Sequence, residues 1–245
     1  LWIDCAAPVI LTLVTYTGVT AESYLAAEAE RRKTRALFGR YVSPVVVEEL
    51  TKRPELVELG GKRQEVTVLF SDIRSFTSYS ETRAPEEVVS RLNEYLSAMT
   101  AAVFRHGGMI DKYMGDGIMA VFGAPVPQTD HAARAIRASR EMRERLLELN
   151  KKRGSRGEPP IEIGIGLSSG PVVVGNIGSS ERMDYTVIGA DVNLASRLEN
   201  LTKEYGTQLI LNGRTLQSLK DSGAAAPWRF EELGAVPIRG FTVPI

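Results

Sequence analysis

The order of strand-like and helix-like segments from residue 64 onward is the feature that most constrains the fold. Short apolar runs predict strands, and longer stretches with apolar residues at a helical period predict helices. The first expected elements are a strand over 65–70 that ends at Asp72, a helix from Pro85, hairpin strands over 109–113 and 118–122, and a helix over 131–150. Those that follow are strands over 161–167 and 172–177 as a second hairpin-like pair, a helix over 190–205, a strand over 208–211, a helix over 214–220 and an extended segment over 231–245. Strand, helix, two hairpin strands, helix and strand is the split βαβ order, so we expect an α+β, ferredoxin-like (βαββαβ) domain with additional strands and helices.

Charge and the scarcity of metal-binding side chains narrow the possible functions. Lys plus Arg and Asp plus Glu each number 30, so no basic excess is present to neutralise a nucleic-acid backbone. A single cysteine excludes an internal disulfide and a cysteine-based zinc site, and two histidines exclude a histidine-rich metal cluster. Oxygen ligands must then hold any metal, which favours Mg²⁺ or Mn²⁺.

The first residues predict a membrane attachment. No charge occurs from Cys5 to Val19, a run shorter than the roughly 20 residues that span a bilayer. We interpret residues 1–20 as the end of a transmembrane helix and not as a secretory signal, with an ordinary buried helix as the alternative. The basic cluster from Arg31 to Arg35 favours a cytoplasmic position for everything downstream. Residues 21–46 predict a helical linker, which is either a solvated connection or a signalling helix.

Asp72 and Asp116 are candidate metal ligands. Asp72 follows an apolar strand and Asp116 lies at a hairpin tip, so both carboxylates are expected at one edge of the sheet. Two such groups can hold two hard cations that clamp the attacking and leaving oxygens of a phosphoryl displacement. The turn after Asp72 offers backbone N–H groups near Phe76 and Thr77 to phosphate oxygens. Taken singly, each aspartate is more often a turn residue.

Three separated segments make a stronger case together. FSDIRSFT at 70–77, DKYMGD at 111–116 and YTVIGADVNLASRLE at 185–199 closely resemble motifs of the class III nucleotidyl cyclases. The resemblance runs in order from about residue 65 to the end, about three-quarters of the chain. It implies a class III catalytic domain over 47–245 after the membrane helix and the linker, and an upstream sensor outside the chain.

The resemblance also implies roles for individual residues. Asp72 and Asp116 match the two metal-binding aspartates, with the carbonyl of Ile73 as a further ligand. Asn193 and Arg197 match the pair that orients the ribose and stabilises charge on the phosphates. Their spacing of four residues on one helix face lets both reach the same substrate.

Lys112 and Thr186 match the positions that select the base. Lys is typical of family members that act on ATP, whereas those that act on GTP usually carry Glu. Thr186 stands where many adenylate cyclases have Asp, and its hydroxyl is suitable but less discriminating, because it can accept as well as donate. Thr at this position resembles the subgroup that includes bicarbonate-responsive members, which makes bicarbonate regulation a hypothesis. Arg239, followed by Gly240, stands where the family has a phosphate-binding Lys.

The implied activity is that of a membrane-attached, bacterial-type adenylate cyclase. With two divalent cations, Mg²⁺ or Mn²⁺, the ribose 3′-hydroxyl of ATP attacks the α-phosphorus to give 3′,5′-cyclic AMP and pyrophosphate. Asp72, water and a substrate phosphate oxygen are the candidate acceptors of the proton. Family members place the metal aspartates and the other site residues on opposite partners, so a homodimer with shared sites is expected.

Three alternatives remain. A guanylate cyclase is the nearest, and Lys112 argues against it. A diguanylate cyclase is disfavoured, because its Gly-Gly-acidic-acidic-Phe hairpin signature is absent at Gly115-Asp116-Gly117. A catalytically inactive domain that binds nucleotide or transmits a signal is the third, and both aspartates and Arg197 argue against it.

Overall fold

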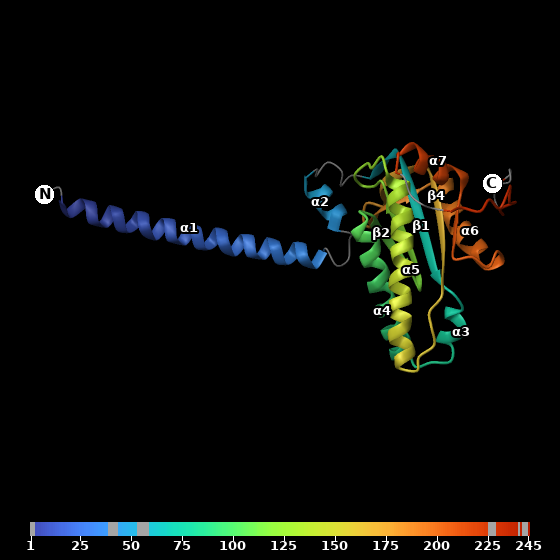
Figure 1. The fold of residues 1–245 in the computed structure, drawn as a ribbon. Helices are drawn as coiled ribbons and strands as arrows, with labels where there is room; N and C mark the ends of the chain where they lie inside the picture. Colours follow the sequence, from blue (N-terminus) through green and yellow to red (C-terminus); the bar gives the residue numbers. More distant parts are fainter. Residues whose placement is uncertain (1–2, 39–43, 53–58, 225–228, 240, 242–244) are drawn as a thin grey trace. The chain divides into compact units, whose positions relative to one another are not determined.

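The computed structural model describes residues 3–38, 44–52, 59–224, 229–239, 241 and 245. The chain divides into two compact units, Leu1–Glu48 and Glu49–Ile245, and each is described by itself. Helix α2 (Pro44–Lys52) begins in the first unit and ends in the second. The sheet and its covering helices all belong to the second unit (Figure 1).

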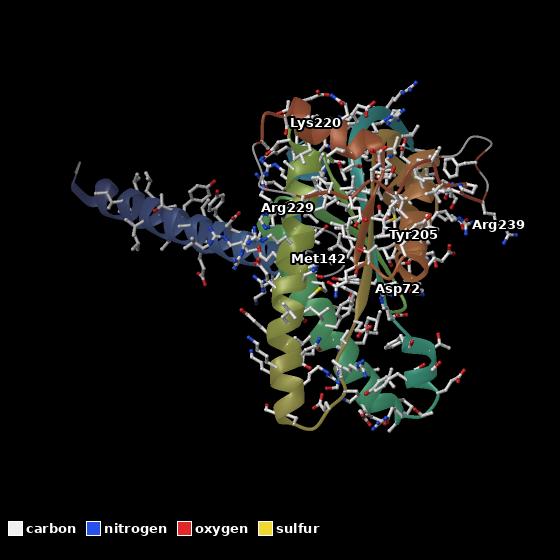
Figure 2. All side chains as sticks on the ribbon, turned by 45° about the vertical axis from the view of Figure 1, so that its right-hand side comes forward. Asp72, Met142, Tyr205, Lys220, Arg229 and Arg239 are labelled. Atoms are coloured by element: carbon white, nitrogen blue, oxygen red, sulfur yellow. The ribbon has the colours of Figure 1, made fainter. Side chains whose placement is uncertain are left out.

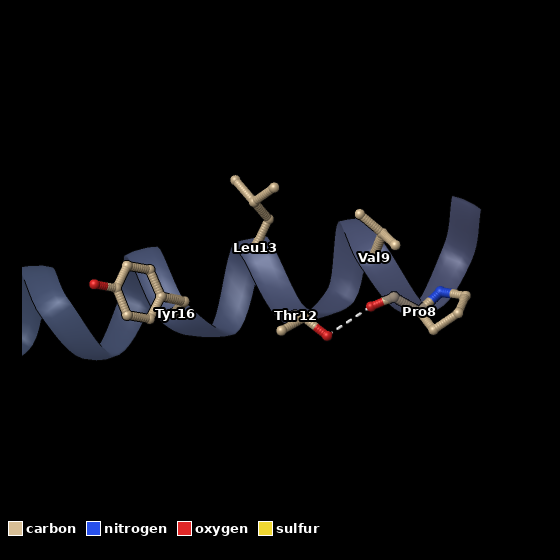
Figure 3. Close-up of a pocket in the computed structure, with 5 residues that line it drawn as sticks. All are labelled: Pro8, Val9, Thr12, Leu13 and Tyr16. Carbon is tan, nitrogen blue, oxygen red and sulfur yellow. Dashed lines mark hydrogen bonds between the residues drawn. The ribbon is translucent and has the colours of Figure 1, made fainter. Parts of the chain in front are cut away.

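The first unit consists mainly of one long helix, α1 (Ile3–Phe38), which joins the predicted membrane segment to the predicted linker as far as Phe38. Residues 39–43 of that linker lie outside the described residues. Its Pro8–Glu30 part has a mean hydropathy of 1.2 and is long and apolar enough to cross a membrane by length and composition alone. Thr12 donates its hydroxyl to the Pro8 carbonyl at 2.7 Å (Figure 3), and three later threonines bond backward in the same way. Such bonds satisfy hydroxyl groups within the helix itself. The shallow hollow beside Thr12 is lined by α1 alone, so we assign it no function.

The second unit has the predicted α+β architecture. Its elements are β1 (Gly60–Ile73), α3 (Phe76–Ser80), α4 (Pro85–Arg105), β2 (Met109–Met114), β3 (Gly117–Phe122), α5 (His131–Ser155), β4 (Ile163–Gly178), β5 (Met183–Ile188), α6 (Ala190–Glu204), β6 (Leu209–Leu211) and α7 (Gly213–Asp221). The strand order is β2-β3-β1-β4-β5, with antiparallel neighbours, and β6 joins β4 in parallel. Strands β1 to β4 with helices α4 and α5 form the ferredoxin-like core.

Alternate residues of β4 face different helices. Ile163, Ile165 and Leu167 lie in the main core with residues of α4 and α5. The intervening Gly164 and Gly166 face α6 instead, and a Cβ at Gly166 would lie 2.2 Å from the Ala195 carbonyl oxygen. Helix α6 therefore packs almost directly on the backbone of β4, and Figure 1 shows α5 and α6 on either side of the β1–β4 pair.

The predicted second hairpin is wrong. Residues 163–178 form one strand, which pairs with β1 from Ile73↔Ile163 to Gly60↔Asn176. The small residues at 168–170 are typical of turns, but they are buried in the strand. Ser168 donates to Asp191 of α6 and a Cβ at Gly170 would clash with Asp191, whereas Ser169 hydrogen-bonds to Thr67 of β1. On its other side, the second half of this strand pairs with β5, a strand that the apolar pattern did not predict.

Candidate active site

Asp72 and Asp116 meet where β1 leaves the sheet beside the β2–β3 turn. Strand pairing of Ser71 with Ile118 places Asp72 next to Gly117. If Gly117 carried a side chain, its Cβ would lie 3.4 Å from Asp72 Oδ1. Gly115, with φ 66°, gives the hairpin its tight turn. The backbone of Ile73 hydrogen-bonds to the Asp116 carboxylate, so these three residues form one cluster.

Asp72 perturbs the carboxyl group of Asp116. The pKa of Asp116 is raised to about 6, mainly by burial and also by its hydrogen bond with Asp72 and the charge of Asp72, while backbone hydrogen bonds partly oppose the rise. Two partly buried carboxylates in contact are unfavourable without a cation between them. A divalent ion would remove this repulsion, so the cluster fits a metal site.

The few oxygen donors at this site fit Mg²⁺ or Mn²⁺, which keep water and phosphate ligands, better than a metal ion that protein side chains enclose completely. Within the described part of the chain, no group of three or more His, Cys, Asp and Glu side chains could hold a metal ion. Asp72, Asp116 and the carbonyl of Ile73 would leave several coordination positions for water and substrate phosphates. That arrangement is typical of Mg²⁺ sites that handle nucleotides.

The chain turns directly from this cluster into α3. Ser75, with φ 57°, is the one described residue other than glycine with a positive φ, and it caps the short helix that begins at Phe76. The N–H groups of Phe76 and Thr77 lie in the first helical turn, where no acceptor within the helix is available. Such N–H groups, close to Asp72 in the sequence, can donate to phosphate oxygens.

Lys112 and Thr186 come together although their strands are at opposite ends of the sheet order. Both contact the carboxylate of Asp111, which lies between them. Thr186 Oγ1 donates to Asp111 Oδ2 at 3.0 Å, and Lys112 Nζ lies 3.4 Å from the same oxygen. Asp111 was quoted in the sequence motif, but only the structure shows that it joins the two predicted base-contacting residues.

Asn193 and Arg197 both lie on the exposed side of α6, as their spacing predicts. The opposite side of the helix carries Ala195, Leu198 and Glu199, which are buried against the sheet. Among the described residues of one protomer, no hydrogen bond or ion pair joins Asn193 or Arg197 to the aspartate pair.

Sequence reasoning missed Glu199. Its side chain is buried, and within the described residues its Oε1 has no hydrogen-bond partner. Burial raises the pKa of Glu199, and the charges of Asp72 and Asp116 raise it further. A charged residue at an apolar position of the helix, in register with Ala195 and Leu198, was the signal that could have found it.

Arg239 lies on the C-terminal segment, after α7. It is exposed, and Figure 2 shows it reaching outward while Asp72 lies at the end of β1. The described structure does not join Arg239 to the metal cluster of the same protomer.

Comparison with known proteins agrees with this arrangement. The model of the Adenylate and Guanylate cyclase catalytic domain matches residues 60–243. Adenylate cyclase 1 of Rhizobium meliloti is 39% identical over 206 residues, which is 83% of this chain and 30% of that protein. An adenylate cyclase of Anabaena cylindrica is 38% identical over 77% of this chain and 38% of its own length. The chain thus spans about a third of these relatives.

The solved structures similar to this chain belong to the same family, and they include both an adenylyl cyclase and a guanylyl cyclase. The adenylyl cyclase CyaB from P. aeruginosa matches with a TM-score of 0.68 and 35% identity, over 76% of this chain and 93% of that one. The guanylyl cyclase Cya2 matches with a TM-score of 0.61 and 46% identity, over 66% of this chain and 81% of that one. By its fold, its motifs and the family model that covers most of its length, the chain belongs to the class III adenylate and guanylate cyclases.

Proposed function

We propose that this chain is the catalytic part of an adenylate cyclase that converts ATP to 3′,5′-cyclic AMP and pyrophosphate. The observation that carries the proposal is the coexistence of two clusters, the aspartate pair of Asp72 with Asp116 and the base-contacting pair of Lys112 with Thr186. The first suits the triphosphate and the second suits adenine. An inactive signalling domain would not need both.

The choice of ATP over GTP rests on the base-contacting residues and not on overall similarity, because a guanylyl cyclase is 46% identical to the chain. Lys112 carries donors only, which suits the acceptor N1 of adenine and opposes the N1–H of guanine. Its ammonium is partly exposed and is held near Asp111, so it remains available to a base.

In this proposal, Asp72, Asp116 and the Ile73 carbonyl would hold two divalent cations. When bound, the cations lower the pKa of the ribose 3′-hydroxyl and neutralise charge on the phosphates. The N–H groups of Phe76 and Thr77 bind phosphate oxygens. The ribose 3′-hydroxyl gives its proton to Asp72, to water or to a substrate phosphate oxygen. The 3′-oxygen forms a bond to the α-phosphorus, the bond from that phosphorus to the bridging oxygen breaks, and pyrophosphate leaves.

The remaining groups come from a second copy of the chain. Asn193 and Arg197 are exposed on α6, and Arg239 is exposed on the C-terminal segment. In a two-fold dimer, these side chains, together with Lys112 and Thr186, would approach the metal cluster of the partner. Asn193 would orient the ribose, and the guanidinium groups of Arg197 and Arg239 would stabilise phosphate charge as it develops. A homodimer with two equivalent shared sites completes both clusters.

The proposal includes attachment to the cell membrane through α1, with the catalytic unit in the cytoplasm. Its support is the apolar Pro8–Glu30 segment, its self-satisfied threonine hydroxyls and the basic residues that follow it.

A product assay tests the function. Purified protein is incubated with ATP or GTP in the presence of Mg²⁺ or Mn²⁺, and cyclic AMP and cyclic GMP are separated by chromatography. We expect cyclic AMP from the wild type and neither product from Asp116→Asn. Preferential formation of cyclic GMP would favour the guanylate cyclase alternative, and the absence of both products would favour an inactive domain.

A further inference from the structure

Asp111 occupies an unusual position for a carboxylate. It lies on β2, a strand at one end of the sheet order, yet its side chain is 0% exposed. The pairing of β2 with β3 shifts here, because Ile110 pairs with Ala120 and Lys112 with Met119, which leaves Asp111 as the extra residue of a bulge. A bulge redirects side chains that would otherwise point to opposite faces, and Asp111 and Lys112, although adjacent, contact one another.

The hydrogen bond from Thr186 determines what its hydroxyl can offer to a ligand. A threonine hydroxyl has one proton to donate and two lone pairs that accept, whereas an ionised carboxylate only accepts. Thr186 donates that proton to Asp111 Oδ2 at 3.0 Å. The Thr186 oxygen can therefore only accept from a bound base.

The charge state of Asp111 follows from its surroundings. Burial raises the pKa of the Asp111 carboxyl, and the hydrogen bond from Thr186 and the nearby ammonium of Lys112 oppose that rise. The charge of Asp184, on β5, raises it slightly. Within the described residues, Asp111 Oδ1 is buried without a hydrogen-bond partner, so the contacts given for Asp111 are concentrated on Oδ2.

We propose that Asp111 is a positioning residue that makes Thr186 an obligatory acceptor and thereby selects adenine over guanine. Adenine presents an acceptor at N1 and a donor amino group at C6, which match the Lys112 ammonium and the acceptor oxygen of Thr186. Guanine presents the reverse at both places, with a donor at N1 and an acceptor at C6. Without Asp111, Thr186 could rotate and donate to the guanine oxygen. The inference rests on the proposed function, because it requires that Lys112 and Thr186 contact the base.

The test compares ATP with inosine triphosphate, whose ring presents the same N1–H and C6 oxygen as guanine without the 2-amino group. The quantity measured is the ratio of kcat/KM for ATP to kcat/KM for inosine triphosphate. Asp111→Asn is expected to lower this ratio by about 10-fold or more, since an amide can donate to the Thr186 oxygen and free its proton. A destabilised fold would lower both values of kcat/KM equally and leave the ratio unchanged.

Two further variants isolate the hydrogen bond. Asp184→Asn makes the same change of charge on an exposed side chain two residues before Thr186, and we expect it to keep the wild-type ratio. In a Thr186→Val background, Asp111→Asn is expected to have no further effect on the ratio, because the hydroxyl through which it acts is gone. If turnover of Asp111→Asn is too slow to measure, calorimetric binding of 3′-deoxy-ATP and 3′-deoxyinosine triphosphate gives the corresponding ratio of affinities.

The outcomes separate this inference from the proposed function. A wild type that prefers ATP, together with a ratio that Asp111→Asn leaves unchanged, overturns the role of Asp111 and retains the adenylate cyclase. If Asp111→Asn lowers the ratio equally with Thr186 intact and in the Thr186→Val background, the role of Asp111 is also overturned. A wild type without preference for ATP overturns the proposed function and this inference with it.

Discussion

The close packing of α6 on β4 predicts a large effect from a single methyl group. In Gly166→Ala, the new Cβ would lie 2.2 Å from the Ala195 carbonyl oxygen and 2.3 Å from the Glu199 backbone nitrogen, where ordinary contacts begin at 3.4 Å. Both neighbours are backbone atoms of a helix, so no change of side-chain rotamer relieves the clash. The helix must move by about 1 Å, and overpacking of this kind costs about 1–3 kcal/mol. We expect the free energy of unfolding to fall by about 3 kcal/mol.

The same displacement reaches the proposed active site, because α6 carries Asn193 and Arg197. A misplacement of about 1 Å can reduce turnover by about 100-fold, so activity should fall in the protein that remains folded. Gly154→Ala is the matched control. It lies in α5 with no atom within 4 Å of an added Cβ, and a helical alanine there should stabilise by up to about 0.5–1 kcal/mol.

Urea denaturation followed by circular dichroism measures both variants. The midpoint for Gly166→Ala should lie well below that of the wild type, and the midpoint for Gly154→Ala should equal or exceed it. If Gly166→Ala unfolds at the wild-type midpoint with wild-type turnover, the close approach of α6 to β4 is refuted.

Two other predictions concern charged groups at the site. In metal-free protein, the pKa of Asp116 is raised from the ordinary value of 3.8 to about 6, so the folded state binds this proton more tightly than the unfolded state does. Protonation of Asp116 therefore stabilises the fold fully below pH 3.8, and this stabilisation is lost as pH rises through about 6. Urea midpoints measured with a chelator should show this decline in stability, and Asp116→Asn should remove it. The affinity for Mn²⁺ should weaken as pH falls below about 6. An affinity for Mn²⁺ that does not depend on pH would contradict the assignment of Asp116 as a metal ligand. Arg197→Ala should lower kcat by about 10²–10³-fold and change stability by no more than about 0.5 kcal/mol, because its side chain is exposed and acts only as charge develops. Steady-state kinetics and urea titration separate the two effects, and an unchanged kcat would exclude a role in the transition state.

The sequence predicted those parts of the molecule that have a local signal. Hydrophobic periodicity predicted the helices from Pro85 and from His131, and the order of strands and helices predicted the α+β fold. The continuous strand β4 escaped prediction because Ser168, Ser169 and Gly170 are typical turn residues. Ser168 and Gly170 instead lie against Asp191 of α6, and Ser169 hydrogen-bonds to Thr67 of β1. A long-range contact of this kind leaves no local pattern.

In the candidate site, too, only the features with a local sequence signal could be predicted. The spacing of Asn193 and Arg197 was sufficient to place both on one face of a helix. The burial of Glu199 and the joining of Lys112 to Thr186 by Asp111 depend on a bulge and on contacts between separate elements. The sequence left Thr186 an ambiguous donor or acceptor, and its hydrogen bond to Asp111 is the observation that assigns its polarity.

Complementation between two inactive variants tests the account most directly. Asp72→Ala removes a proposed metal ligand and Asn193→Ala removes a proposed ribose contact, and each homodimer should be inactive. When the two proteins are co-expressed with different affinity tags and the heterodimer is isolated, one of its two sites contains both intact residues. The account predicts that this heterodimer forms cyclic AMP from ATP at about half the wild-type rate. A heterodimer as inactive as either parent would contradict a site shared between two protomers.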